Sequence, residues 1–122
     1  MRVLIIDDDE IFCRLLVEIL EGSGVQAIWT TDGLAGYEML THGEYDVSII
    51  DVRMPLILGT EIAEAIREDH PGTKIILASA FADETLRDYA THKGIFLLSK
   101  PFTANRLLYV VERVLGESIG RN

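Results

Sequence analysis

Short apolar runs alternate with longer segments in which apolar residues recur at helical spacing, from one end of the chain to the other. The runs, rich in leucine and β-branched residues, predict strands at residues 3–6, 25–30, 47–50, 74–78 and 95–99. The segments of helical spacing predict helices within residues 11–20, 31–43, 59–72, 83–92 and 103–115. Thr60 is the predicted N-cap of the third helix, because a hydroxyl oxygen can accept a hydrogen bond from a backbone N–H in the first turn.

Five strand–helix units in succession predict an α/β fold, an open and doubly wound sheet of five parallel strands with five helices on its two faces. Strands that are apolar at nearly every position agree with a sheet covered on both sides. A chain of 122 residues has room for one domain with one sizeable core. We predict a domain over residues 1–117 and a tail, or the stub of a linker, over residues 118–122.

Charge and composition narrow the range of functions that the chain can have. A net charge of −9 argues against direct nucleic-acid binding, which needs clustered Lys and Arg, and is compatible with a cation site or a basic protein partner. No apolar run reaches the roughly 20 residues that span a bilayer, so no membrane is expected. The single cysteine, Cys13, cannot form an internal disulfide and lies in a helical pattern. This favours a core position for Cys13 and a cytoplasmic location for the chain.

Polar residues follow four of the five predicted strands. In such sheets ligands bind outside the carboxyl ends of the strands. The residues at these ends are Asp7, Asp8, Asp51, Ser79 and Lys100. Each one alone is an ordinary turn residue. Together, an acid pair, a further acid, a hydroxyl and a lysine at one edge of the sheet predict a functional site.

Clustered carboxylates repel one another unless positive charge lies between them. Mg²⁺ prefers hard oxygen ligands and is usually bound by one or two carboxylates together with phosphate oxygens and water. A carboxylate can itself attack phosphorus, and the transferring phosphoryl group then needs positive charge and hydrogen-bond donors. The predicted site therefore holds a metal with at least two acids and accepts a phosphoryl group on another.

The sequence resembles the receiver domain of two-component response regulators over essentially the whole chain. The motifs that carry the resemblance, in matching order and spacing, are "VLIIDDDE", "SIIDVRMP", Gly59, "IILASA" and "SKPF". The resemblance implies the flavodoxin-like strand order 2-1-3-4-5, for which a chemotaxis member of this family is a known example. It also implies a signalling phosphoacceptor that assists its own phosphorylation and dephosphorylation, and not an enzyme with an external product.

The resemblance also implies roles for individual residues. Asp51 would be the phosphoacceptor, and Asp7 and Asp8 the acidic pair that binds Mg²⁺ (or Mn²⁺) together with Asp51. Arg53 would offer its backbone carbonyl to the same metal.

The remaining roles concern residues at the ends of the fourth and fifth predicted strands. Ser79 would be the switch hydroxyl that moves to bond the phosphoryl group, and Ala80 its small neighbour. Lys100 would pair with the phosphate. The peptide bond before Pro101 is often cis in this family.

Two departures from the family pattern stand out. Leu97 occupies the position where the family usually has Tyr or Phe, whose ring turns inward when the hydroxyl moves. Phe96 is adjacent, and we expect it to point to the other face of the strand and into the core. The second departure is "PLILG", residues 55–59. We expect its three apolar residues to cap the core under the third helix; the alternative is a docking patch for a kinase or phosphotransfer domain.

Two bulky residues, Arg53 and Phe81, flank the expected phosphate at positions where this family tunes hydrolysis. We predict that they screen the phosphorus from water and slow autodephosphorylation. The alternative for Arg53 is exposure to solvent or a salt bridge with a nearby acid. Asp9 and Glu10 are expected to be solvated charges at a helix start.

The implied partners are a histidine kinase or histidine phosphotransfer protein as donor, and a downstream protein or an attached output domain as receiver of the signal. A homodimer through the last helix and strand is possible. One rival function is a small phosphatase of the haloacid dehalogenase type, with Asp7 as nucleophile and Asp9 as acid/base. That family needs an acidic motif after its lysine, and no acid follows Lys100 until Glu112. The other rival is an unphosphorylated pseudo-receiver that acts as an interaction module.

Overall fold

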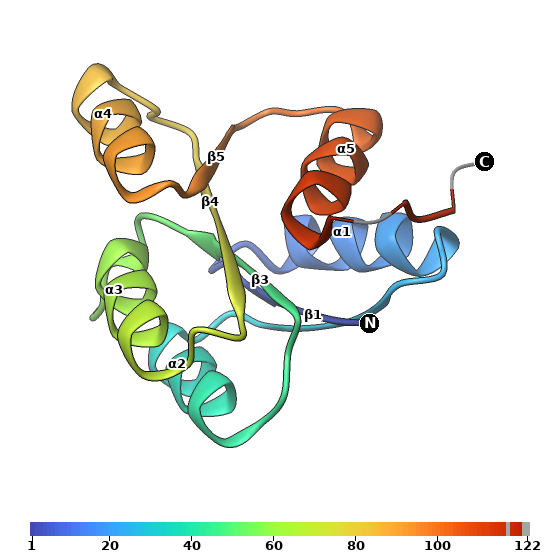
Figure 1. Ribbon diagram of the computed structural model, residues 1–122, viewed down its shortest axis with the longest axis horizontal. Helices are drawn as coiled ribbons and strands as arrows, with labels where there is room; N and C mark the ends of the chain where they lie inside the picture. The colour runs from blue at the N-terminus through green and yellow to red at the C-terminus, as the bar shows by residue number, and fades with distance from the viewer. Residues whose placement is uncertain (117, 121–122) are drawn as a thin grey trace.

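The computed structural model describes residues 1–116 and 118–120. Within them, five parallel strands form one sheet in the order β2-β1-β3-β4-β5 (Figure 1). The strands are β1 (Arg2–Ile6), β2 (Gln26–Thr30), β3 (Val47–Asp51), β4 (Lys74–Ser79) and β5 (Phe96–Ser99). The predicted fold class and strand order are confirmed.

A helix follows each strand along the chain. The helices are α1 (Glu10–Gly22), α2 (Gly33–His42), α3 (Gly59–Asp69), α4 (Glu84–Lys93) and α5 (Ala104–Leu115). Helices α1 and α5 cover one face of the sheet, while α2 and α3 lie on the other (Figure 1). Side chains of α4 pack on that second face too.

The core has two layers because successive side chains of a strand point to opposite faces. In β1, Val3 and Ile5 pack with α1 and α5, while Leu4 and Ile6 pack with α2 and α3. All four are fully buried. Cys13 is also fully buried, in the α1 and α5 layer, which confirms its predicted core position.

Side chains cap most of the helices. Asp9 is the N-cap of α1, and its Oδ1 accepts a hydrogen bond from the Phe12 N–H at 3.1 Å. The prediction for α3 was wrong, because Thr60 lies inside that helix and Leu58 occupies the cap position. The Leu58 N–H donates to the carboxylate of Glu61 at 2.9 Å, which is the half of a capping box that the third residue of a helix supplies.

Two expectations about apolar residues needed correction. Phe96 is not a core residue, because β5 is an edge strand and the ring lies at its beginning, where 36% of the residue stays exposed. Of the three apolar residues at positions 56–58, Ile57 packs against the core. Leu56 and Leu58 are 88% and 48% exposed, so this segment caps the core with one residue of three.

The predicted domain boundary at residue 117 lies outside the described residues, as do the last two residues of the predicted tail. Ile119 packs against the core layer of α1 and α5. The N–H of Gly120 donates to the carbonyl of Ser23 at 3.2 Å. Among the residues described, no helix has the length and apolar character needed to cross a bilayer.

Candidate functional site

The carboxyl ends of β1, β3 and β4, and the residue after β5, bring the predicted site residues to one edge of the sheet. Asp7 and Asp8 follow β1, while Asp51 and Ser79 are the last residues of β3 and β4. Carboxylate oxygens of Asp7, Asp8 and Asp51 all lie within 4.8 Å of one another. Asp7 and Asp51 are buried, and Asp8 is exposed. Lys100 follows β5 and completes the group.

Three hydrogen bonds hold Asp7 in place. Its N–H donates to the Thr30 carbonyl at 3.2 Å, which continues the pairing of β1 with β2. The N–H of Asp9 donates to Asp7 Oδ1 at 3.0 Å, and Cys13 Sγ donates to the Asp7 carbonyl at 3.2 Å. The carboxylate therefore has a fixed direction before any ligand binds.

The backbone of Gly59 lies very close to the backbone of Asp51. The N–H of Gly59 donates to the Val52 carbonyl at 2.9 Å. A Cβ atom on Gly59 would lie 2.1 Å from the carbonyl oxygen of Asp51, closer than any real contact allows. Glycine is therefore required here so that α3 can begin directly behind the buried acid.

Lys100 bridges the two buried carboxylates. Its Nζ lies 2.6 Å from Asp7 Oδ2 and 3.4 Å from Asp51 Oδ1, and 19% of its side chain is exposed. The backbone N–H of Lys100 donates to the Ser79 carbonyl at 2.8 Å, which ties it to the end of β4. The peptide bond between Lys100 and Pro101 is cis, as the family resemblance implied.

Electrostatics at the site are dominated by the buried acids. Burial and the negative charge of Asp7 raise the pKa of Asp51 from 3.8 to about 6, against the opposing effect of Lys100. Burial lowers the pKa of Lys100, but the hydrogen bond and charge of Asp7 outweigh burial and leave that pKa above its ordinary value. The site is thus short of positive charge, with one cation for three acids.

Ser79 ends β4, and Phe81 lies on the loop that follows. Ser79 is buried, and its Oγ accepts a hydrogen bond from the Phe81 N–H at 3.0 Å. Ala80 is exposed and Phe81 is 67% exposed. The exposed side chain of Arg53 lies over the Phe81 ring, with Cζ 5.5 Å from the ring centre. The exposure expected of Arg53 as an alternative is confirmed, whereas its contact with the Phe81 ring was not anticipated.

Two further residues complete the surroundings. Leu97 is half-buried and packs in the layer that includes Leu86 and Tyr89 of α4. Sequence reasoning missed Phe12, whose ring centre lies 4.4 Å from Lys100 Nζ. The helical pattern around Phe12 did not indicate this contact, because Lys100 lies far from Phe12 in the sequence.

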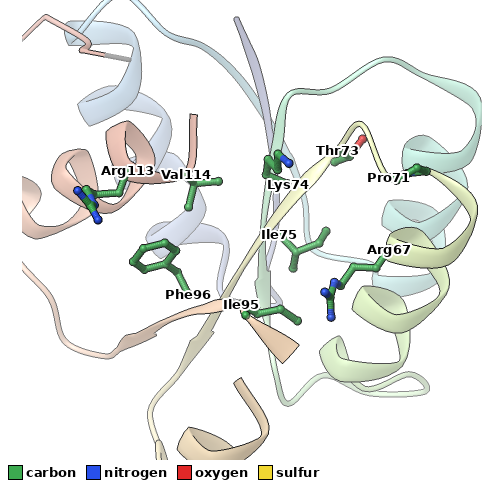
Figure 2. A pocket seen from close by; sticks show the side chains of 10 residues that line it. Arg67, Pro71, Thr73, Lys74, Ile75, Ile95, Phe96, Arg113 and Val114 are labelled. Carbon is green, nitrogen blue, oxygen red and sulfur yellow. The ribbon is translucent and has the colours of Figure 1, made fainter. Parts of the chain in front are cut away.

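A hollow of about 360 Å³ lies at the opposite edge of the sheet, at the beginnings of β4 and β5 (Figure 2). Its cationic side chains are Arg67, Lys74 and Arg113. Arg67 and Arg113 belong to the last turns of α3 and α5, where positive charge complements the helix dipole. The predicted site residues Asp7, Asp8, Asp51 and Lys100 do not line this hollow.

Comparison with known proteins agrees with the fold. The model of the response regulator receiver domain matches residues 3–112. The chain is 31% identical over 115 residues to the response regulator receiver protein CpdR of Brucella abortus, covering 93% of this chain and 96% of that protein. It is 28% identical to the transcriptional regulatory protein RprY of Bacteroides fragilis, where it covers 99% of this chain and 52% of that protein.

Solved structures show the same architecture. A CheY-like receiver domain protein from Methanospirillum hungatei has a TM-score of 0.88 at 24% identity, covering 94% of this chain and 93% of that one. The response regulator TrrA from Thermotoga maritima, solved in complex with Mg²⁺-BeF, has a TM-score of 0.84 at 30% identity, covering 93% and 98%.

The chain belongs to the response regulator receiver domain family of two-component systems. Receiver domains are signalling domains and not enzymes in the ordinary sense. The family match favours the receiver domain over the phosphatase alternative. Asp9, to which that alternative assigned the acid/base role, is the N-cap of α1.

Proposed function

We propose that this receiver domain accepts a phosphoryl group on Asp51 from a histidine kinase or a histidine phosphotransfer protein. The observation that carries the proposal is the position of Asp51, a buried carboxylate that faces Lys100 and adjoins Asp7 and Asp8. In the transfer, an Asp51 carboxylate oxygen forms a bond to phosphorus while the P–N bond of the donor histidine breaks, and the imidazole nitrogen keeps the electron pair.

The donor set at this edge fits Mg²⁺ or Mn²⁺. Three carboxylates offer hard oxygen ligands within 4.8 Å of one another, and one of the three is exposed to solvent. Asp7, Asp8 and Asp51 would hold the ion, together with the backbone carbonyl of Arg53. When bound, the ion supplies the positive charge that the acids and an incoming phosphoryl group need. The complex of TrrA with Mg²⁺-BeF supports this assignment by analogy.

Lys100 and Ser79 are suited to hold the transferred group. The ammonium of Lys100 already contacts Asp51 and would donate hydrogen bonds to phosphoryl oxygens. The hydroxyl of Ser79 accepts from the Phe81 N–H, which leaves its own O–H free to donate. Ala80 beside it is small and exposed, so a movement of this loop meets little steric resistance.

Phosphorylation would then shift the balance between two conformations, read out on the face formed by α4, β5 and α5. A shift from mostly inactive to mostly active needs several kcal/mol of differential stabilisation. Leu97 replaces the usual switch aromatic on this face, and the loop that begins with Lys100 and Pro101 follows β5. The receiver of the signal is a downstream protein or an attached output domain, and α5 with β5 offers a surface for a homodimer. The cytoplasmic location stays a prediction.

The decisive experiment is intact-protein mass spectrometry after incubation with acetyl phosphate, with and without Mg²⁺. We expect wild type to gain one phosphoryl group in a Mg²⁺-dependent manner and Asp51→Asn to gain none. Asp88→Asn, which changes an exposed acid of α4, is the matched control and should react as wild type does. An unmodified wild-type protein would favour the pseudo-receiver. Steady release of phosphate that requires Asp7 would favour the phosphatase.

A further inference from the structure

The ammonium group of Lys100 lies against an aromatic ring as well as two carboxylates. Its Nζ is 4.4 Å from the centre of the Phe12 ring, 2.6 Å from Asp7 Oδ2 and 3.4 Å from Asp51 Oδ1. Phe12 belongs to the first turn of α1 and is half-buried. The ring is therefore part of the immediate surroundings of the lysine.

The properties of an ammonium group explain how the contact with Phe12 can restrain Lys100. The group has three N–H donors, and the two carboxylates offer partners for two of them. The face of a phenyl ring attracts a cation within about 6 Å of its centre. Without such a contact, the flexible four-carbon stem and the strongly hydrated charge of a lysine leave the ammonium free to move. Phe12 thus offers the third contact of Lys100.

The ring of Phe102 fixes the orientation of the Phe12 ring. Phe12 and Phe102 meet edge to face, with their centres 5.5 Å apart and their planes at 77°. Phe102 lies two residues after Lys100, between β5 and α5. Both rings pack against the core layer to which α1 and α5 contribute. The face of Phe12 is consequently held toward the ammonium by the core itself.

We propose that Phe12 is a positioning residue for Lys100, which keeps the ammonium beside Asp51 where a phosphoryl group would arrive. The inference rests on the proposed phosphoacceptor function. It extends that function by assigning a role to a helix residue outside the strand ends. Loss of the π face should slow phosphorylation of Asp51 by about threefold to tenfold, the range expected for one partly exposed cation–π contact.

The test separates the π face of Phe12 from its bulk. Phe12→Leu keeps an apolar side chain and removes the π face, while Phe12→Tyr keeps the ring. Phe96→Leu, which changes an aromatic residue of β5 outside the site, is the control. We would measure the rate of adduct formation with acetyl phosphate and Mg²⁺, and the free energy of unfolding. In metal-free protein, the chemical shift of the Lys100 ε-methylene protons would be measured by NMR.

We expect the ε-methylene protons to be shifted upfield by the ring current in wild type and Phe12→Tyr, and to lose this shift in Phe12→Leu. We also expect slower adduct formation in Phe12→Leu alone. An unshifted Lys100 signal in wild type, equal rates in all variants, or an equal loss of rate in Phe12→Tyr would overturn the inference. If Phe12→Leu does not fold, Phe12→Met replaces it. The NMR measurement needs no phosphorylation, so failure of the proposed function is recognised separately.

Discussion

The guanidinium group of Arg53 lies over the ring of Phe81, with Cζ 5.5 Å from the ring centre. One residue follows β3 and the other follows β4, so the pair spans the edge of the sheet beside Asp51 and Ser79. Both side chains are exposed on their outer surfaces. We predict that a phosphoryl group on Asp51 would arrive next to this pair and that the pair would limit the access of water.

We predict slow hydrolysis of the phosphorylated protein and faster hydrolysis when either member of the pair is removed. Arg53→Ala and Phe81→Ala should each shorten the lifetime of the phosphoaspartate by about tenfold, equivalent to about 1.4 kcal/mol of activation free energy. The decay would be followed by mass spectrometry after removal of acetyl phosphate. Tyr109→Ala is the control, since Tyr109 is an exposed aromatic of α5 stacked by Arg106. Rapid decay in wild type that Arg53→Ala leaves unchanged would contradict the prediction.

The raised pKa of Asp51 predicts a pH-dependent effect on stability. Because the pKa rises from 3.8 to about 6 on folding, the stability that Asp51 contributes is fully present below pH 3.8 and is lost as the pH rises through 6. In the presence of EDTA, Asp51→Asn should therefore be more stable than wild type at neutral pH, by about 3 kcal/mol. This difference should vanish near pH 4.

Urea denaturation at the two pH values would measure this difference, with Asp88→Asn as the control for loss of an exposed acid. A difference between Asp51→Asn and wild type that does not change with pH would show that repulsion at the site has another source.

The close approach of Gly59 to Asp51 predicts a large cost for one added methyl group. Gly59→Ala should lower the free energy of unfolding by about 3 kcal/mol, because the new Cβ would meet the Asp51 carbonyl at 2.1 Å. Gly72→Ala is the matched control, since nothing lies within 4 Å of a Cβ at that position. Equal stabilities of the two variants in urea would mean that the β3–α3 segment rearranges freely.

Burial of Cys13 predicts an unreactive thiol. Burial and the negative charges of Asp7 and Asp9 raise the pKa of Cys13 to about 12, and the thiolate is the reactive form. Native protein at pH 8 should react with Ellman's reagent only as fast as it unfolds, whereas protein in guanidinium chloride should react at once. Stoichiometric labelling of the native protein within seconds would contradict this prediction.

The conformation of Leu56 predicts a stabilising substitution. Leu56 has φ of 73° and is 88% exposed, so it combines a left-handed backbone with an apolar side chain in water. Asn tolerates this conformation better than other residues with a side chain. Leu56→Asn should raise the free energy of unfolding by about 1 kcal/mol. Leu56→Ala keeps the backbone strain and should change stability little; equal gains from both variants would assign the effect to the side chain's exposure.

Much of the fold follows from local patterns. The all-apolar strands and the helical spacing between them predicted each element of the described chain, because a sheet covered on both faces leaves few polar positions in its strands. Thr60 was misassigned as a cap, since the start of α3 is decided by the contact of Gly59 with β3. Phe96 was assigned to the core, although an edge strand leaves its first residue partly uncovered.

The sequence by itself determined which residues meet at the site. Asp7, Asp51, Ser79 and Lys100 follow or end parallel strands, and parallel strands deliver their carboxyl ends to one edge whatever the details of packing. Only the tertiary structure decided what surrounds them. The contact of Arg53 with Phe81 joins the loops after β3 and β4, and that of Phe12 with Lys100 joins α1 to the end of β5. Both join segments far apart in the chain and depend on the rotamers that tertiary packing allows, which no local pattern records.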